Sequence, residues 1–228
     1  MNTPKVHVKR ALMSISHRVN VSDSIEDKLV AMCELARSDF SHLLPHGDMR
    51  RLESRSLLGS LLLSTVLVDE YPTCKTIADF GGGIGFPGLP MAIISPGLYV
   101  KIVESNKVKI QAAESIATAL NINNVDFECR DIREEQTENE YDVIVGRRVA
   151  PIESFLSMCN RHRPSLGCLY LCGYNSTQMQ SSLTQVIKLE SLSIDGVLPI
   201  KGECIAVVHS NDLKSFNNLN RWSKDRYN

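Results

Sequence analysis

The sequence lacks a long apolar run and any cysteine pairing typical of a metal site. A membrane-spanning helix needs roughly 18 consecutive apolar residues, and no run of that length occurs. The seven cysteines are scattered, with no C-x-x-C pair and no histidines at zinc spacing. The basic N-terminus leads into no apolar segment of a signal peptide. We therefore expect a cytoplasmic protein with reduced thiols, no metal and no membrane contact.

The sequence also lacks an excess of charge of one sign. Its 25 Lys and Arg against 26 Asp and Glu give a formal net charge of -1. A dedicated nucleic-acid binder usually carries a basic excess over its footprint, so any such contact must come from local clusters. Basic clusters occur at Arg50, Arg51 and Arg55, at Arg130 and Arg133, at Arg147 and Arg148, and at Arg161 and Arg163.

The first 70 residues are expected to form a helical extension that packs on the main domain. Residues 1–20 are polar, basic and weakly patterned, which indicates an arm or a loosely docked helix. Apolar residues then recur at spacings of three and four, which predicts amphipathic helices over about 24–43 and 49–68. A polar tail is expected at 211–228.

Residues 71–210 alternate short apolar runs with helical segments. Such alternation is typical of a parallel sheet with crossover helices, so we expect a Rossmann-like α/β domain with a mostly parallel seven-stranded sheet. The last two predicted strands leave no room for a helix between them, which indicates an antiparallel hairpin at one edge. Strands are expected near 76–80, 99–103, 125–129, 142–145, 168–172, 188–194 and 203–209, and helices near 88–94, 107–120, 151–161 and 176–186.

A glycine-rich segment, Asp79 to Gly88, joins the first of these strands to a helix. Glycines at such a turn let the backbone bend sharply and approach a ligand closely. Gly83, Gly85 and Gly88 formally satisfy the dinucleotide fingerprint G-x-G-x-x-G, and Glu104 follows at the end of the next strand. The segment therefore predicts either a dinucleotide or another nucleoside cofactor.

The acidic residue Asp79 favours S-adenosylmethionine over NAD. A carboxylate two residues before the first glycine would repel a pyrophosphate, whereas S-adenosylmethionine has no phosphate and carries two cationic groups. Glu104 is then placed to accept hydrogen bonds from the ribose hydroxyls, as in both cofactor classes. Asp131, just after the third predicted strand, lies where an adenine ring is expected, although an ordinary capping role is an equal interpretation.

Two arginines, Arg147 and Arg148, follow the fourth predicted strand. Open α/β folds bind their substrates at the carboxyl ends of the strands, so both are candidates for substrate binding. For Arg148, an ion pair with the acidic residues near Glu134 and Glu135 is an equal alternative.

These segments resemble the RsmG or GidB family, the bacterial small-subunit ribosomal RNA guanine-N7 methyltransferases of class I. The resemblance covers about residues 50–210, and its most specific part is DFGGGIGFPGLP at Asp79–Pro90. Weaker support comes from Glu104-Ser105-Asn106-Lys107, Cys129-Arg130-Asp131 and Val145-Gly146-Arg147.

The resemblance implies an S-adenosylmethionine-dependent enzyme whose partner is ribosomal RNA or the small ribosomal subunit. We separately expect a monomer or weak homo-oligomer. The resemblance also implies a positively charged rim for RNA, to which Lys107, Arg130 and Arg147 belong. From its position after the fourth predicted strand, we also expect Arg148 to contact the substrate. The expected cofactor-binding residues, from the glycine turn and the resemblance together, are Asp79, Gly81, Gly83, Gly85, Phe86, Glu104, Asp131, Ile132 and Arg147.

Several basic positions of the family are replaced in this chain. Where the family usually has a His and an Asp before the sheet, this chain has Ser56 and Gly59, and Cys172 replaces a Lys. Cys204 and Ile205 stand at an Arg-His pair, while Arg148 replaces a small residue. These departures support the alternative of a diverged methyltransferase acting on a small heteroaromatic molecule or another RNA. A noncatalytic RNA-binding or assembly factor is a third interpretation.

Guanine N7 has a lone pair and no proton to lose, so its methylation needs no general base. Catalysis would come from proximity and orientation, which are worth roughly 7 to 11 kcal/mol. We expect Arg147 to be the catalytic residue, orienting the substrate by donating to the guanine O6 edge or by holding a phosphate.

Overall fold

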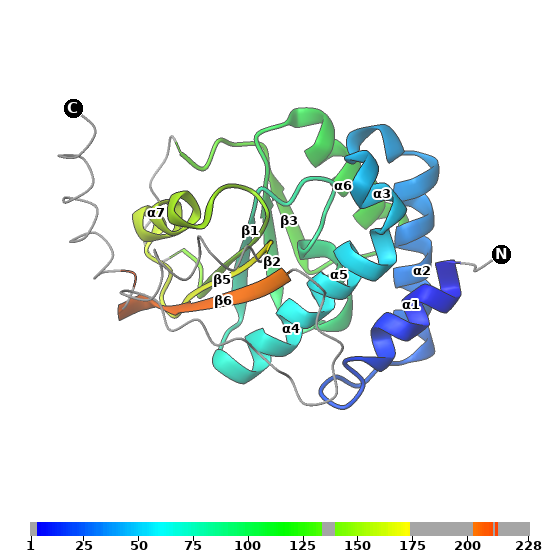
Figure 1. Ribbon diagram of the computed structural model, residues 1–228, viewed down its shortest axis with the longest axis horizontal. Coiled ribbons are helices and arrows are strands. Elements are labelled where there is room, and N and C mark those ends of the chain that lie inside the picture. Colours follow the sequence, from blue (N-terminus) through cyan, green and yellow to red (C-terminus); the bar gives the residue numbers. More distant parts are fainter. Residues whose placement is uncertain (1–3, 134–139, 174–202, 212, 214–228) are drawn as a thin grey trace.

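A single sheet with helices on both faces forms the centre of the molecule (Figure 1). The computed structural model describes residues 4–133, 140–173, 203–211 and 213. Within these residues the sheet has six strands in the order β3-β2-β1-β4-β5-β6, with β6 antiparallel and the others parallel. The strands are β1 (Thr76–Phe80), β2 (Tyr99–Val103), β3 (Val125–Glu128), β4 (Val143–Arg147), β5 (Gly167–Gly173) and β6 (Glu203–His209). This arrangement confirms the predicted Rossmann-like α/β class.

Each face of the sheet is covered by its own set of helices. Alternate residues of a strand point to opposite faces, so Ile77 joins the larger core cluster and its neighbour Ala78 joins the smaller one. Side chains of the N-terminal helices fill the larger cluster, together with α5 (Gly88–Ile94) and α6 (Lys107–Ala119). The smaller cluster is filled mainly by α7 (Ile152–His162). The strands are therefore buried on both sides, which explains their nearly continuous apolar sequences.

The N-terminal helix α1 (Pro4–Met13) is packed more firmly than its sequence suggested. Val8 and Ile15 are fully buried and Leu12 is 3% exposed. Val8 and Leu12 lie four positions apart on one helical face, and Ile15 follows just after the helix ends, although basic residues between Val8 and Leu12 obscure the pattern. The prediction of an arm or a loosely docked helix for this segment is wrong, because the segment contributes to the main core.

The two predicted helices of the extension are each divided. The first consists of α2 (Asp23–Ser38), capped by the Ser22 hydroxyl that accepts from the Ile25 N–H, and a 3-10 turn η1 (Ser41–Leu43). The second consists of three elements: α3 (His46–Arg50), a π-helical stretch η2 (Leu52–Leu57) and α4 (Leu58–Glu70). Short π-helical stretches are frequent at functional sites, and η2 lies beside the cavity described below.

Some predicted elements lie outside the described residues. These are the helix at 176–186, the strand at 188–194 and nearly all of the tail at 211–228. The seventh strand and its hairpin with β6 therefore stay predictions, as does the domain boundary near residue 70. In the described part of the chain, each helix is too short or too polar to cross a bilayer.

Candidate functional site

The turn after β1 has a backbone that only glycine adopts readily. Gly81, Gly83 and Gly85 have φ angles of +71°, +58° and +107°, which lie in the left-handed region. A Cβ built on Gly83 would meet no atom within 4 Å, so this side of the turn is open. A Cβ on Gly85 would lie 2.3 Å from the Leu89 side chain, so this glycine serves the packing of the turn on α5. The backbone of the turn is therefore accessible to a ligand at Gly83, whereas at Gly85 it packs against the Leu89 side chain.

Asp79 lies beneath this turn and is fully buried. Its Oδ2 atom accepts a hydrogen bond of 2.7 Å from the Gly88 N–H, which ties the two ends of the turn together. Oδ1 has no hydrogen-bond partner among the described residues. Burial raises the pKa of Asp79 to about 7, opposed by the Gly88 hydrogen bond and the positive charge of Arg147. The carboxyl group thus shapes the turn from below.

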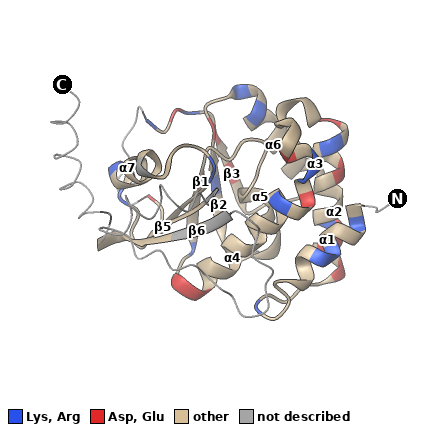
Figure 2. Ribbon diagram, in the orientation of Figure 1, with Lys and Arg blue, Asp and Glu red and all other residues tan. Residues whose placement is uncertain are grey.

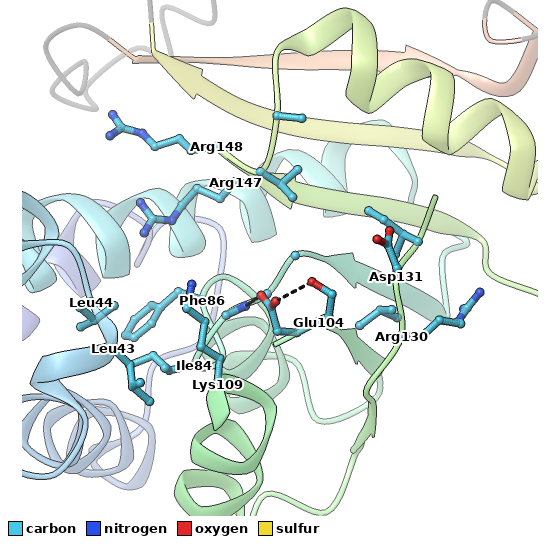
Figure 3. A pocket seen from close by; sticks show the side chains of 18 of the residues that line it. Leu43, Leu44, Ile84, Phe86, Glu104, Lys109, Arg130, Asp131, Arg147 and Arg148 are labelled. Carbon is cyan, nitrogen blue, oxygen red and sulfur yellow. Dashed lines mark hydrogen bonds between the residues drawn. The ribbon is translucent and has the colours of Figure 1, made fainter. Parts of the chain in front are cut away.

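A cavity of about 470 Å³ opens above the turn, at the carboxyl ends of β1, β2 and β4 (Figure 3). This volume falls in the usual range of small-molecule sites, about 300 to 1,000 Å³. Nine predicted site residues line it: Gly81, Gly83, Phe86, Glu104, Arg130, Asp131, Ile132, Arg147 and Arg148. The structure therefore brings most of the candidates from four separate loops into one place.

Three predicted site residues do not line the cavity. Asp79 lies beneath the turn, Gly85 is the part of the turn that packs against Leu89, and the exposed Lys107 is the first residue of α6. Lys109, two residues further along α6, lines the cavity instead. The cap formed by Asn106, whose side chain accepts from the backbone N–H of Lys109, sets the start of the helix and hence its orientation.

Glu104 faces the turn from the end of β2. Its Oε2 atom accepts from the Gly83 N–H at 3.1 Å, and its Oε1 atom accepts from the Asn106 N–H at 2.9 Å. The carboxylate is thereby fixed at the cavity wall, and each oxygen retains lone-pair capacity for a further donor. An acceptor pair of this kind suits two neighbouring hydroxyl groups.

Asp131 makes the local hydrogen bonds of a capping residue, while its expected place beside an adenine ring stays a prediction. It lines the cavity, and its carboxylate also accepts hydrogen bonds from the Arg133 side chain and the Arg133 backbone N–H. These hydrogen bonds lower the pKa of Asp131 to about 2. Arg130 also forms an ion pair within the cavity wall, because its Nε atom lies 2.7 Å from Oε1 of Glu128. Both residues therefore give the cavity a rigid polar wall.

Arg147 reaches from the end of β4 toward the helical extension (Figure 3). Only 7% of its side chain is exposed. Its Nη2 atom donates to the Ser56 hydroxyl at 3.0 Å and lies 3.8 Å from Oδ2 of Asp48. Ser56 belongs to η2 and Asp48 to α3, so the extension holds this guanidinium group at the cavity.

The loop after β4 is fastened from the opposite face of the sheet. The Tyr170 hydroxyl of β5 accepts from the Ala150 N–H at 3.2 Å and donates to the Ala150 carbonyl. Arg148 adopts a left-handed conformation with φ of +54° and donates its backbone N–H to Leu171. Glu134 and Glu135, the predicted ion-pair alternative for Arg148, lie outside the described residues. The loop thus sets where both arginines leave the sheet.

The extension also supplies cavity residues that sequence patterns did not reveal. Leu43, Leu44, Pro45 and Asp48 line the cavity, from the segment that runs from the end of η1 into α3. A break at Pro45–Gly47 marks this segment in the sequence, but nothing local indicates which part of the domain it covers. The extension is therefore part of the site.

Comparison with known proteins places this architecture in a family. The GidB family, described as rRNA small subunit methyltransferase G, matches residues 35–197. Ribosomal RNA small subunit methyltransferase G of Parabacteroides distasonis is 26% identical over 166 residues, covering 71% of this chain and 70% of the relative. The protein of the same description from Flavobacterium psychrophilum is 30% identical over 144 residues, covering 60% and 67%.

Solved structures show the same fold at low identity. Magnesium protoporphyrin IX methyltransferase from Synechocystis PCC 6803, solved with bound SAM, has a TM-score of 0.56 and 13% identity, covering 83% of this chain and 98% of that one. A SAM-dependent methyltransferase from Aquifex aeolicus has a TM-score of 0.53 and 14% identity, covering 73% and 98%. At these identities the likeness concerns the fold alone.

Proposed function

Because this chain belongs to the GidB family of small-subunit rRNA methyltransferases, we propose that it methylates N7 of a guanine in the RNA of the small ribosomal subunit. It is an enzyme that uses S-adenosylmethionine. One observation carries the residue assignment: a single cavity brings together the open glycine turn, the Glu104 carboxylate and the Arg147 guanidinium.

The residues of the cavity fit this cofactor. Gly83 leaves its side of the turn open, and Glu104 presents acceptors for the ribose hydroxyls. Asp131 and Ile132 line the part of the wall assigned to the adenine ring. Oδ1 of Asp79 is buried under the turn without a hydrogen bond among the described residues. The electrostatic potential of this oxygen favours a cationic ligand. S-adenosylmethionine, when bound, supplies an electrophilic methyl group on a sulfonium.

Arg147 orients the target base. Its guanidinium carries several donors in a rigid plane, which suits the O6 edge of a guanine or a phosphate oxygen. N7 reacts through its own lone pair, so the protein has no proton to remove. The contribution of the side chains is therefore alignment, which requires that Arg147 be held still.

Ser56 and Asp48 are positioning residues for Arg147. The hydroxyl accepts one guanidinium N–H at 3.0 Å, and the carboxylate adds attraction at 3.8 Å. Both come from the extension, so its docking on the sheet fixes the guanidinium before substrate arrives. This preorganisation reduces the ordering needed when the substrate binds.

We assign this enzyme to the cytoplasm, where its substrate resides, and propose that it acts as a monomer or weak homo-oligomer. The basic residues Arg130, Arg147 and Arg148 at the cavity, with Lys109 added by the structure, support contact with RNA. Lys107 is exposed nearby in sequence and remains a candidate for the outer RNA surface.

Methyl transfer to isolated ribosomal particles tests this function. Small subunits from a bacterial strain that lacks its own family member are incubated with the purified chain and labelled S-adenosylmethionine, with large subunits as the control. We expect label only in small-subunit RNA, at a nucleoside that mass spectrometry identifies as 7-methylguanosine. Label at another base, or no label from protein that binds the cofactor in calorimetry, would refute the assignment.

A further inference from the structure

A second cavity, of about 320 Å³, lies within the helical extension. Among the described residues it shares no lining residue with the cavity at the glycine turn. Four elements supply its wall: Pro4 and His7 from α1, Arg37 from α2, Arg50 from α3, and Glu53 and Ser54 from η2. It is therefore a separate place where a ligand can bind.

The floor of the second cavity is an ion pair without net charge. Glu53 is only 4% exposed. Its Oε1 and Oε2 atoms accept from Nε and Nη2 of Arg37 at 3.0 and 2.5 Å, and Nη1 of Arg37 donates to the Met49 carbonyl. The carboxylate is thus fully compensated by a bidentate partner. It offers little repulsion to an anion in the cavity.

The rim of the second cavity consists of donors. Arg50 is exposed, and within the described residues its guanidinium takes part in no ion pair or hydrogen bond. The exposed Ser54 hydroxyl and the half-buried His7 imidazole face the same space. A guanidinium, a hydroxyl and an imidazole above a neutral floor are the groups that bind an oxyanion.

The surrounding surface strengthens this preference for anions. Figure 2 shows Lys and Arg segments on α1 and α3, at the end of the molecule where the chain begins. Residues 1–22 contain no Asp or Glu and four basic residues, of which Lys5 lies near Asp27 and Arg18 pairs with Asp69, while Lys9 and Arg10 are exposed. A local excess of positive charge raises the concentration of polyanions at the surface.

The acidic residues of the segment from His46 to Arg55 do not neutralise the positive charge of its exposed arginines. Its two acids, Asp48 and Glu53, each face an arginine outside the segment, Arg147 and Arg37 respectively. Arg50 and Arg51 remain exposed. The folding of the extension therefore turns a mixed sequence into a basic surface.

The same short helices separate the two cavities. Asp48 lines the first cavity and Arg50 the second, two residues apart on α3. Likewise Ser56 contacts Arg147, while Ser54 lines the second cavity. The separation is thus on the order of one helix diameter, about 10 to 12 Å. An RNA strand that places a base in the first cavity can reach the second with a nearby phosphate.

We propose that the second cavity, with Arg50 as its main donor, binds a backbone phosphate of the substrate RNA beside the nucleotide that is methylated. This inference rests on the proposed function, since it takes RNA as the polyanion. Phosphate contacts set the register of a protein on a nucleic acid without reading its sequence. The second cavity therefore positions the RNA strand.

Salt-dependent RNA binding by an Arg50→Gln variant tests the proposal. The control is Lys75→Gln, which removes an exposed cation just before β1, at the opposite end of that strand from the glycine turn. Dissociation constants for deproteinised small-subunit RNA and for intact small subunits are measured between about 50 and 200 mM salt. We expect Arg50→Gln to weaken binding about 5- to 10-fold and to reduce the slope of log K against log salt by about 0.7 to 0.9.

Further variants separate phosphate binding from other effects. Arg50→Lys is expected to retain most of the salt slope, because it keeps the charge, while the cofactor affinity stays at the wild-type value in both Arg50 variants. Lys75→Gln is expected to leave the slope unchanged. Equal thermal unfolding of all variants shows that the fold is intact.

Two results would overturn the proposal. One is an unchanged salt slope in Arg50→Gln. The other is weaker binding to intact subunits with normal binding to deproteinised RNA, which would assign the surface to a ribosomal protein. If the wild-type chain binds RNA through Arg50 but methylates no subunit RNA, the proposed function fails while the phosphate site stands.

Discussion

The guanidinium group of Arg147 depends on residues far away in the chain. Its position at the end of a strand is evident from the sequence, because apolar residues lead directly into Gly146 and Arg147. Its partner Ser56 lies 91 residues earlier, and no spacing or pattern connects the two. Their contact arises only when the extension docks on the sheet, so the sequence predicted the candidate residue and missed what holds it.

Replacing Arg147 with Ala is expected to reduce methyl transfer about 100-fold or more while changing the cofactor affinity far less. The variant loses the donor that orients the base but leaves the glycine turn and Glu104 in place. Single-turnover kinetics with small subunits and calorimetry with S-adenosylmethionine measure the two effects. Arg147→Lys, which keeps the charge but not the planar fork, should recover only part of the rate. A normal rate in Arg147→Ala would remove this residue from the mechanism.

Ser56→Ala is expected to lower kcat about 3- to 10-fold, which corresponds to the net contribution of a typical hydrogen bond, roughly 1 kcal/mol. The cofactor affinity should not change. Ser64→Ala is the matched control, because the Ser64 hydroxyl is also buried but donates to the Ser60 carbonyl of its own helix. Equal rates for both variants would show that Ser56 does not position Arg147.

At the scale of elements, strands were predicted more accurately than the helices of the extension. The strands are short apolar runs buried on both faces, and their ends are marked by turns such as Asn121–Asn124. The helix predicted over 49–68 instead contains the π-helical stretch Leu52–Leu57. Leu52 and Leu57 are buried there just as in a continuous α-helix. Apolar spacing therefore does not distinguish the two backbones.

The packing of α1 gives a stability prediction. Leu12→Ala should lower the free energy of unfolding by about 2 to 4 kcal/mol, because it removes a buried side chain and leaves a cavity. Met13→Ala, at a side chain that is 67% exposed, should change it by less than about 0.5 kcal/mol. Urea unfolding of both variants measures the difference. If Leu12→Ala lowered the free energy of unfolding as little as Met13→Ala, α1 would not be part of the core in solution.

Two replaced family positions lie together at the sheet edge. Cys172 of β5 and Cys204 of β6 are paired in the antiparallel register. Separated by more than thirty residues in the sequence, they could not be recognised as neighbours before the sheet topology was known. Their pairing places both departures on β5 and β6, the two strands that follow β4 in the strand order of the sheet.

For the whole molecule, the fold class followed from the alternation of strands and helices, and most of the candidate site followed from loops at the carboxyl ends of strands. The role of Asp79 is the main difference. Adjacency to the glycines suggested a direct contact with the cofactor, whereas the structure places the carboxyl group below the turn. Sequence order alone does not show which side of a bend a side chain takes.

The buried Asp79 predicts a pH dependence of stability. Burial raises its pKa to about 7, whereas an unfolded Asp titrates near 3.9. The folded state therefore binds the proton more tightly, and this group lowers the free energy of unfolding by up to about 1.4 kcal/mol per pH unit between about pH 4 and pH 7. Above about pH 7 this group lowers the free energy of unfolding no further.

Asp79→Asn removes this dependence, because an amide does not ionise and can still accept from the Gly88 N–H. Relative to wild type, the variant should gain stability as the pH rises from about 5 to 7 and keep that gain at about pH 8. Urea unfolding at each pH measures the difference. A difference between the two proteins that stays constant across this range would contradict the assignment.

The hydrogen bond between Ser56 and Arg147 also determines when the site can form during translation. Translation delivers the extension first, then the glycine turn, then β4, and after it β5, which pairs with β4. A nascent chain halted before β4 leaves the ribosome tunnel has its turn and its helices but no guanidinium between them. Competence for methyl transfer must therefore appear abruptly, late in elongation.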